Sequence, residues 1–471
     1  MLVHRSGERV TFAGFRRRVE RMAAGLAALG VRSNDVVAWE LPTWVDTVVL
    51  AAALHRLGVT QVPIIAIYRE REVTHCCTQA GARWLITPSV YRGVDFVPMA
   101  TAVQDRTGVQ TLVLDPGTFP ESEEPLPSPI NRSDPRWIFY TSGTTSAPKG
   151  ARQTDAALAA VAAGMGSRLR LGPGDRNAMV FPFPHIGGII VLFTALQTGA
   201  TLLMDDAFDP PATIPFLAAE GVTHAGTGTP FHLAYLAAQR AQPDRPLFPR
   251  LRCCPGGAAP KPPSLHAQIK AELGGVGIVS GWGLTEAPVL TFSNFDDPDE
   301  KLAATEGRAL DGVELRTVEG ELWARAPQVT AGYVDSSLDA DAFVDGWFRT
   351  GDLGTIDEGG YVTITGRLKD IIIRNGENVS AKEVEDLLFT HPSVSDAAVI
   401  GLPDPRTGER VCAVVVGTLA FADMQAWLTD QGLRRQAVPE QLEIVEVLPR
   451  NPAGKVTKKV LQERFGVAPL R

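Results

Sequence analysis

The sequence predicts an α/β fold: a large N-terminal domain with parallel α/β subdomains and a small β-rich subdomain, then a small C-terminal domain. Three observations predict it. Short apolar strands alternate with helical segments over residues 36–87, the pattern of a parallel sheet covered by helices. Residues 313–364 change to short strands separated by Gly and Asp turns. Finally, 471 residues are too many for one ordinary core, so at least two domains are expected.

The N-terminal elements follow from local patterns. An amphipathic helix with its arginines on one face is predicted over residues 10–29. The alternating segments after it are a strand at 36–40, a helix near 45–57, a strand at 62–65, a helix near 70–79 and a strand at 84–87. Residues 115–134, rich in Pro, Ser and Glu, should form an exposed connection.

One uncharged stretch, residues 186–204, is long enough to raise the question of a membrane span. It carries three glycines and a glutamine and divides into a helix and a short strand at 200–204. We therefore expect buried core and no integral membrane span.

A boundary is predicted at residues 366–370, which divides the chain into domains of residues 1–367 and 368–471. The C-terminal elements are a strand at 371–373, a helix at 382–388, strands at 397–402 and 411–416, a helix around 422–431 and a strand at 442–447. This piece is near the lower size limit for an independent core.

Composition limits the function. The chain is 45% hydrophobic and 21% charged, as in a soluble globular enzyme. Its formal charge of −8 argues against nucleic acid as a partner. Five cysteines, without C-x-x-C spacing, fit reduced buried thiols better than disulfides or zinc. Because no secretory signal is visible either, a cytoplasmic location is expected.

The loop at residues 140–150, YTSGTTSAPKG, combines small hydroxyl and glycine residues with a lysine, Lys149. A strand end is predicted at 137–140 and a helix from Thr154 onward. Free backbone N–H groups, hydroxyls and the lysine charge suit the phosphates of a nucleotide. The spacing does not match a Walker A loop, and a surface turn is an equally good reading of this segment alone.

A second motif is GWGLTE at residues 281–286. Trp282, between two glycines, suits contact with a purine ring, while Thr285 offers a hydroxyl to phosphate and Glu286 a carboxylate to Mg²⁺. Taken alone, the motif fits a structural aromatic in a tight turn at least as well.

Three later motifs carry charged groups in turns. Asp352, in WFRTGD at 347–352, suits two ribose hydroxyls, although such an aspartate usually caps the backbone. Residues 366–370 and 375–379 lie where the domains should join and suggest a hinge. Lys455, in the Pro-Gly turn NPAGK, can reach an active site when a small domain closes, although such a lysine is usually a surface charge.

In this order and at these distances, the motifs resemble those of the adenylate-forming superfamily, and more narrowly the acyl-CoA synthetases, over residues 10–455. The resemblance implies a small β-barrel-like subdomain and a mobile α+β C-terminal domain. For the nucleotide, it implies that the ATP phosphates are bound by Thr141, Ser142, Gly143, Thr144, Thr145 and Lys149, the adenine by Gly257, Ala258, Ala259 and Trp282, and the ribose by Asp352 and Arg367. For catalysis, it implies roles for Lys455, His185, Thr285 and Glu286, with Mg²⁺ bound by Glu286. For the domain motion, it implies a hinge at Lys369 and a coenzyme A tunnel lined by Gly376, Glu377 and Asn378.

The implied reaction has two halves. A small-molecule carboxylic acid reacts with ATP to give acyl-AMP and pyrophosphate, and coenzyme A then takes the acyl group as a thioester. His185, in FPFPHIGG at 181–188, would be the gate beside the acid. Since no aspartate lies in that segment to pair with an amine, a neutral acid is favoured. The segment at 66–72, with the motifs above, resembles ligases for medium-chain and alicyclic acids.

Departures from the family pattern are Ser146 in the phosphate loop, Ala381 in place of a frequent proline, and a short stretch between residues 416 and 442. The last weakens the expected coenzyme A contacts. Two alternatives stay open: an acyl-AMP ligase that loads a carrier protein, and a non-catalytic acyl- or nucleotide-binding regulator. The oligomeric state is also open, with a homodimer among the options.

Overall fold

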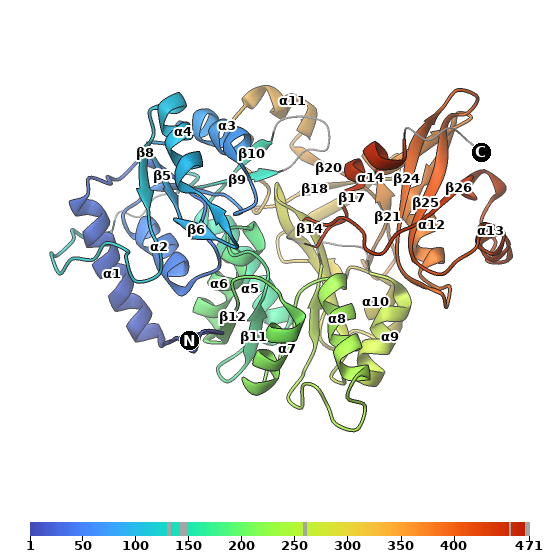
Figure 1. Ribbon diagram of the computed structural model, residues 1–471, viewed down its shortest axis with the longest axis horizontal. Coiled ribbons are helices and arrows are strands. Elements are labelled where there is room, and N and C mark those ends of the chain that lie inside the picture. The colour runs from blue at the N-terminus through green and yellow to red at the C-terminus, as the bar shows by residue number, and fades with distance from the viewer. Residues whose placement is uncertain (130–132, 142–147, 258–260, 452–453, 467–471) are drawn as a thin grey trace.

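A computed structural model of the chain describes residues 1–129, 133–141, 148–257, 261–451 and 454–466. Its N-terminal part begins with a six-stranded sheet in the order β10-β9-β4-β3-β5-β8 (Figure 1). The strands are β3 (Val36–Trp39), β4 (Thr60–Pro63), β5 (Trp84–Thr87), β8 (Gln110–Val113), β9 (Trp137–Thr141) and β10 (Lys149–Gln153). All are parallel except β10, which runs antiparallel to β9.

Helices cover both faces of this sheet because its strands are apolar on both sides. α1 (Phe12–Ala28) and α2 (Val45–Arg56) pack in one core with Val37 and Trp39. α3 (Glu70–Ala80) and α4 (Val97–Thr107) pack on the opposite face, in a core with Ala38 and Leu85. The predicted alternation of strands and helices in this region is confirmed. The short hairpin β6 (Val90–Tyr91) and β7 (Val94–Asp95) lies apart from the sheet.

The second subdomain contains two smaller sheets. The first has the order β11-β12-β1-β2, and the second β13-β14-β15-β16. Their elements are β1 (Leu2–His4), β2 (Arg9–Val10), β11 (Arg176–Met179), β12 (Thr201–Met204), β13 (Cys254–Gly256), β14 (Ile278–Leu284), β15 (Ala287–Phe292) and β16 (Arg308–Ala309), with helices α5 (Asp155–Arg168), α6 (Ile186–Thr198), α7 (Pro210–Ala219), α8 (Thr229–Arg240), α9 (Pro263–Glu272) and α10 (Asp299–Ala304).

Single β-bridges through His224 join these two sheets, because it pairs with Asn177 on one side and Cys253 on the other. The stretch expected to be a buried helix and strand forms α6 and β12, most of whose residues are buried. No helix among the described residues is long and apolar enough to cross a bilayer.

An antiparallel sheet of five strands forms the small β-rich subdomain expected over residues 313–364. It consists of β17 (Glu314–Val318), β18 (Glu321–Arg325), β19 (Phe343–Val344), β20 (Trp347–Ile356) and β21 (Val362–Arg367), with the one-turn helices η1 (Ser336–Leu338) and α11 (Asp339–Ala342) between β18 and β19. Alternate residues of β18 and β20, such as Leu322 and Phe348, enter a core with Trp282 of β14. The β-rich sheet is therefore packed against the second subdomain.

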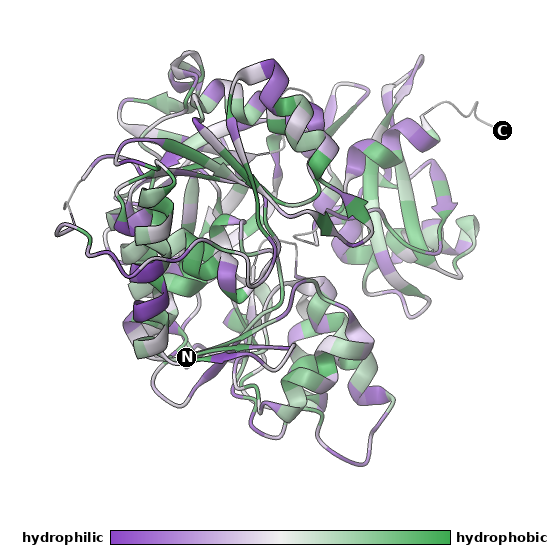
Figure 2. Cartoon of the chain, turned by 60° about the vertical axis from the view of Figure 1, so that its left-hand side comes forward, coloured by the Kyte–Doolittle hydropathy of each residue, from purple (hydrophilic) through white to green (hydrophobic). Residues whose placement is uncertain are grey.

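The C-terminal part has a sheet of its own, in the order β23-β22-β25-β24, with β26 beside β25. Its elements are η2 (Leu368–Asp370), β22 (Ile371–Arg374), β23 (Glu377–Ser380), α12 (Ala381–Leu388), β24 (Val394–Asp404), β25 (Gly408–Gly417), α13 (Phe421–Asp430), η3 (Arg435–Ala437), β26 (Gln441–Ile444) and α14 (Lys458–Phe465). Apolar clusters lie on both faces of this sheet, and Figure 2 shows its strands as hydrophobic between hydrophilic loops.

One element that the sequence did not predict bears on the candidate site. The sequence predicted a strand, a loop and then a helix around residues 137–155, but β10 lies between the loop and α5. The loop therefore closes a hairpin in which Lys149 pairs with Thr141. The predicted helix start is confirmed at Thr154, whose hydroxyl accepts a hydrogen bond from the Ala157 N–H. As a result, Lys149 is held in a sheet at the base of the loop.

Candidate active site

Asp352 lies between two donors. It stands opposite Arg367 in the antiparallel pair β20 and β21, and the two side chains form an ion pair. On its other side, the Trp282 indole Nε1 donates to Asp352 Oδ2 at 2.7 Å. Only 5% of Asp352 is exposed. Because both oxygens of the buried carboxylate are held, it keeps one orientation. The structure thus brings together three residues that the sequence assigned to adenosine.

Trp282 is also a core residue. It is 7% exposed and packs among Leu322, Phe348 and other apolar side chains. The glycines beside it serve β15: a Cβ on Gly281 would lie 2.4 Å from the Thr291 carbonyl oxygen, and one on Gly283 would lie 2.2 Å from the Val289 nitrogen. Packing against β15 therefore requires both glycines, whether or not they also admit a purine. The adenine contact of Trp282 stays a prediction.

Glu286 follows β14, at the start of the hairpin to β15. Its Oε1 accepts a hydrogen bond of 3.0 Å from the Tyr333 hydroxyl. Lys149 Nζ lies 5.9 Å from the centre of the Tyr333 ring. Buried Gln153 donates its amide to the Thr285 and Glu286 carbonyls, at 3.1 and 3.3 Å. The expected metal ligand and the expected phosphate lysine are thus joined through one tyrosine, which the sequence analysis did not identify.

Lys455 belongs to the C-terminal part but faces this site. Its backbone N–H donates to Asn451 Oδ1 at 2.9 Å, which closes the turn. Gly454 has φ of +81°, and a Cβ there would lie 3.1 Å from Pro230 at the start of α8. Lys455 is an exposed residue. Its pKa is nevertheless lowered, first by desolvation of the amine and then by the Arg367 guanidinium.

The charges of four groups act on the pKa of Lys455. Besides Arg367, they are those of Lys369, which also lowers the pKa, and of Asp352 and Glu286, which raise it. All belong to the motifs that the sequence grouped into one site. The contact of Gly454 with Pro230 therefore docks the C-terminal turn against the N-terminal part, near enough to the predicted ribose and metal residues for their charges to act on Lys455.

His185 forms the N-cap of α6. Its Nδ1 accepts a hydrogen bond of 3.1 Å from the Gly187 N–H, so in the neutral ring the proton lies on Nε2. Burial and the charge of Lys455 lower the pKa of His185 to about 4. The ring lines a small pocket together with Tyr68, Tyr140 and Thr285. His185 is thus a neutral hydrogen-bond donor beside Thr285 and Lys455.

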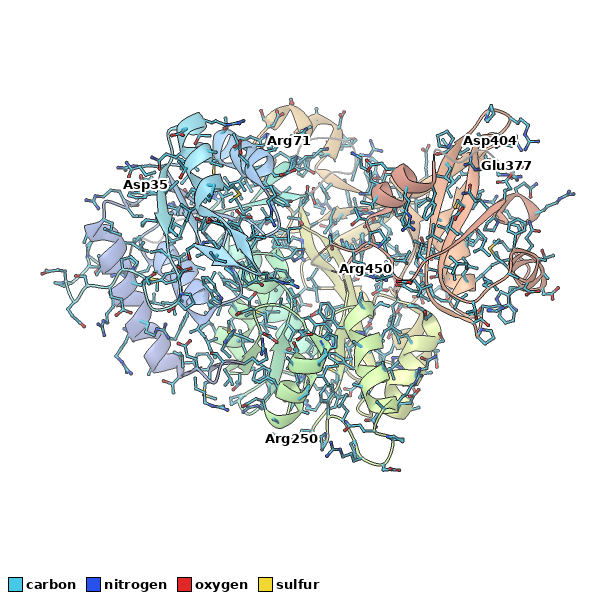
Figure 3. The ribbon with its side chains drawn as sticks, in the orientation of Figure 1. Asp35, Arg71, Arg250, Glu377, Asp404 and Arg450 are labelled. Carbon is cyan, nitrogen blue, oxygen red and sulfur yellow. The ribbon has the colours of Figure 1, made fainter. Side chains whose placement is uncertain are left out.

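The tunnel residues lie apart from Lys455, whereas the charge of the hinge residue Lys369 acts on it. Lys369 is in η2, and burial, followed by the charge of Arg367, lowers its pKa. Gly376, Glu377 and Asn378 are exposed, in the β22–β23 hairpin. Figure 3 shows Glu377 at the far edge of the C-terminal sheet, while Arg450, close in sequence to Lys455, lies on the side facing the N-terminal part. The tunnel residues are therefore not part of the site in this arrangement.

Several predicted residues cannot be placed. Ser142, Gly143, Thr144, Thr145, Ala258 and Ala259 lie outside the described residues. Their neighbours are described: Thr141 ends β9, and Gly257 has φ of +150°, with its ideal Cβ position 3.0 Å from the Gly281 carbonyl oxygen. Thr141 and Gly257 are thus the last described residues before the two segments that lie outside the description.

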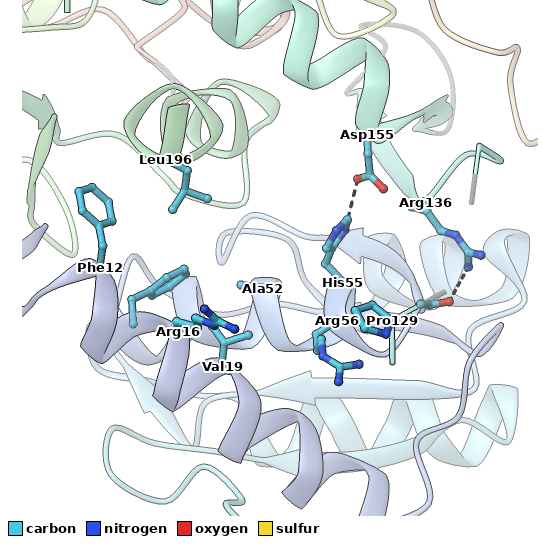
Figure 4. A pocket seen from close by; sticks show the side chains of 12 residues that line it. Phe12, Arg16, Val19, Ala52, His55, Arg56, Pro129, Arg136, Asp155 and Leu196 are labelled. Carbon is cyan, nitrogen blue, oxygen red and sulfur yellow. Dashed lines mark hydrogen bonds and ion pairs between the residues drawn. The ribbon is translucent and has the colours of Figure 1, made fainter. Parts of the chain in front are cut away.

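A larger pocket than the one beside His185 lies elsewhere in the described part of the chain. It measures about 430 Å³ and is lined by α1, α2 and the start of α5 (Figure 4). Phe12 and Leu196 lie toward one end of it, and an ion pair of His55 and Asp155 toward the other. It shares no residue with the predicted site.

The residues present fit a magnesium ion carried by a nucleotide. No group of three or more His, Cys, Asp or Glu side chains in the described residues is arranged to hold a metal. Glu286 offers one carboxylate whose second oxygen, Oε2, accepts no hydrogen bond from a described residue. Magnesium needs only one or two carboxylates when phosphates and waters supply its other ligands.

Comparison with known proteins agrees with the motifs. Residues 1–334 match the AMP-binding enzyme family, and residues 383–455 match its C-terminal domain. The chain is 30% identical to the medium-chain fatty-acid–CoA ligase of Escherichia coli (98% of this chain, 87% of the relative) and 30% identical to salicyl-AMP ligase / salicyl-S-ArCP synthetase of Mycobacterium tuberculosis (98% and 86%).

Among solved structures, ATP-bound MatB from Rhodopseudomonas palustris superposes with a TM-score of 0.89 at 28% identity, over 99% of this chain and 95% of MatB. The chain is thus similar to these proteins over nearly its whole length, in sequence and in fold. The expected family is confirmed: the chain belongs to the AMP-binding enzymes, the adenylate-forming superfamily that includes the acyl-CoA synthetases.

Proposed function

We propose that this protein is an ATP-dependent carboxylic acid–CoA ligase that works through an acyl-adenylate. One observation carries the proposal: the C-terminal turn that holds Lys455 is docked on the N-terminal part, with the ideal Cβ position of Gly454 3.1 Å from Pro230, and the charges of Arg367, Asp352 and Glu286 act on the lysine. A regulator that only bound a nucleotide would not need a lysine from a second domain at this point. Family membership supports the same activity.

In the first half-reaction, an oxygen of the substrate carboxylate attacks the α-phosphorus of ATP. The bond to the β-phosphate oxygen breaks, and pyrophosphate leaves. Asp352 and Arg367 are suited to hold the ribose, because their charges are already paired and oriented. His185 Nε2–H is suited to orient the attacking carboxylate. Lys455 would stabilise the negative charge that develops at the α-phosphate.

Magnesium, held by Glu286 and the phosphates, would neutralise charge on the departing pyrophosphate. Lys149, at the base of the phosphate loop, would add a second cation. Both charges matter most when pyrophosphate forms, since that is when the leaving group gains charge.

In the second half-reaction, the thiol of coenzyme A attacks the acyl carbonyl, the acyl–phosphate bond breaks and AMP leaves. We propose that residues 368–471 then rotate as one domain about Lys369, relative to residues 1–367. This motion would withdraw Lys455 and bring in Gly376, Glu377 and Asn378 to line the coenzyme A tunnel. Their exposed hairpin, remote from the site in the present arrangement, is consistent with such a second state.

The proposed substrate is a neutral acyl carboxylate, of medium chain length or with an alicyclic body. The segment around His185 carries no acidic residue to pair with an amine. The E. coli relative is named for medium-chain fatty acids, and the M. tuberculosis relative for salicylate. The latter is also named for transfer to a carrier protein, so the acceptor needs a direct test.

A thioester screen tests the proposal. The purified protein is incubated with ATP, Mg²⁺ and coenzyme A plus linear, aromatic or alicyclic acids, and products are identified by mass spectrometry. We expect an acyl-CoA that requires both ATP and acid. Pyrophosphate release with acyl-AMP but no acyl-CoA would show that free coenzyme A is the wrong acceptor. No acid-dependent product with any acid would refute a ligase activity.

A further inference from the structure

A short segment, residues 330–334, connects two parts of the predicted site. It follows β18 and pairs with β10: Ala331 N–H donates to the Arg152 carbonyl at 2.9 Å, and Val334 N–H to the Gly150 carbonyl at 2.8 Å. At its start, Thr330 N–H donates to the Glu286 carbonyl at 2.6 Å. This segment, called here the clasp, therefore ties the strand that begins with Lys149 to the residue expected to bind the metal.

Tyr333 is the clasp side chain that reaches both groups. It is 7% exposed, and its hydroxyl donates to Glu286 Oε1 at 3.0 Å. Its ring faces Lys149 Nζ at 5.9 Å, within the range of a cation–π contact. No other described residue donates a hydrogen bond to the Glu286 carboxylate. The tyrosine thus fixes which carboxylate oxygen stays free.

We propose that Tyr333 is a positioning residue for the Mg²⁺ of Mg·ATP. Its hydroxyl holds Glu286 so that Oε2 is free for the metal, and its ring keeps Lys149 beside Glu286. The proposal rests on the proposed function, because it needs a magnesium nucleotide at this site. Without the hydroxyl, the carboxylate loses its described tether and must be ordered when the metal binds. Without the ring, Lys149 loses its aromatic neighbour as well.

The chain contains a matched control. The Tyr361 hydroxyl donates to Asp297 Oδ1 at 2.9 Å, and its ring faces the cations of Lys301 and Arg308, each 5.0 Å from its centre. This repeats the contacts of Tyr333, but none of these residues belongs to the predicted site. Tyr333→Phe removes one hydroxyl donor at the site, and Tyr361→Phe removes the equivalent donor outside it.

Calorimetric titration with ATP, without acid so that no turnover occurs, tests the proposal. It is run in Mg²⁺ and in EDTA on wild type, both Phe variants and Tyr333→Leu, with thermal unfolding as a check on folding. We expect Tyr333→Phe to weaken ATP binding about 3- to 10-fold in Mg²⁺, within the range for loss of one ordinary hydrogen bond, and less than about twofold in EDTA. Tyr361→Phe should change neither.

Tyr333→Leu should weaken binding in EDTA too, because Lys149 then loses the ring. The Tyr333 proposal is wrong if Tyr333→Phe binds Mg·ATP like wild type, or if its loss is equal in Mg²⁺ and EDTA. A wild-type protein that binds no ATP at all would instead overturn the proposed function, so the two failures are distinct.

Discussion

The indole N–H of Trp282 donates to the Asp352 carboxylate at 2.7 Å and so connects β14 of one sheet to β20 of another. Arg367 holds the same carboxylate from the other side. A group proposed to bind ribose is therefore oriented before any nucleotide arrives. Preorganisation of this kind reduces the entropy that binding must overcome.

Trp282→Phe tests that relationship. The variant keeps an aromatic ring but removes the donor, so Asp352 is held by Arg367 alone. We expect the KM for ATP to rise about 3- to 10-fold, within the range for loss of one ordinary hydrogen bond. Steady-state pyrophosphate release measures it. Trp427→Phe is the control, because Trp427 donates its N–H to the Leu387 carbonyl, in the C-terminal part. An equal KM increase in both variants would contradict the assignment.

Lys455→Ala separates the two half-reactions. Loss of one preorganised cation should lower adenylation roughly 10²–10³-fold. Formation of acyl-CoA from supplied acyl-AMP should be spared, because Lys455 is proposed to leave the site for that step. Rapid-quench assays of each half-reaction measure this. Lys459→Ala, which removes an exposed lysine paired at 4.0 Å with Glu463, should change neither. Equal losses in both half-reactions would remove Lys455 from its role.

His185 should remain neutral throughout the physiological range. Its pKa is lowered from 6.5 to about 4 by burial and by Lys455. The chain has eight histidines, so its imidazole signal can be assigned in NMR spectra by comparison with His185→Gln. We expect no titration of His185 between about pH 8 and pH 5.5, and an upward shift of its midpoint in Lys455→Ala. Titration near pH 6.5 in the wild type would show that the ring is neither buried nor close to Lys455.

Glu40 should limit stability at neutral pH. Its side chain is fully buried, neither carboxyl oxygen has a hydrogen-bond partner among the described residues, and burial raises its pKa well above 4.5. The native state therefore holds this proton more tightly than the unfolded state does, so stability falls as pH rises above about 4.5 toward the native pKa.

Glu40→Gln removes that penalty. We expect the variant to be more stable than wild type near pH 7.5, by on the order of 1–3 kcal/mol, and about equal to it near pH 4.5. Urea unfolding at both pH values provides the free energies. A variant less stable than wild type at neutral pH would mean that the carboxylate has a stabilising partner.

The sequence predicted the elements whose apolar residues occupy buried positions in the fold. Strands β3, β4, β5 and β9 of the six-stranded sheet and helix α2 were found within a few residues, because apolar runs become buried strands and helices. β10 was missed, since Lys149–Gln153 has no apolar alternation and forms a strand only by pairing with β9. Long-range pairing of this kind leaves no local signal.

The site was predicted in the same uneven way. Motif order identified Asp352, Glu286 and Lys455, which the structure brings together. Tyr333 was missed because it is 47 positions from Glu286, and a Gly-Tyr dipeptide carries no chemical signature. The sequence related the glycines around Trp282 to the nucleotide alone, and the structure shows that β15 requires them too. Sequence spacing does not reveal which neighbour a glycine accommodates.

Exchange of radiolabelled pyrophosphate into ATP tests the central claim most directly, because only reversible formation of an acyl-adenylate allows it. With the best acid from the thioester screen and Mg²⁺, without coenzyme A, we expect exchange that depends on the acid and is lost in Lys455→Ala but kept in Lys459→Ala. Acyl-CoA formation without any such exchange, or no exchange with any acid, would contradict the account.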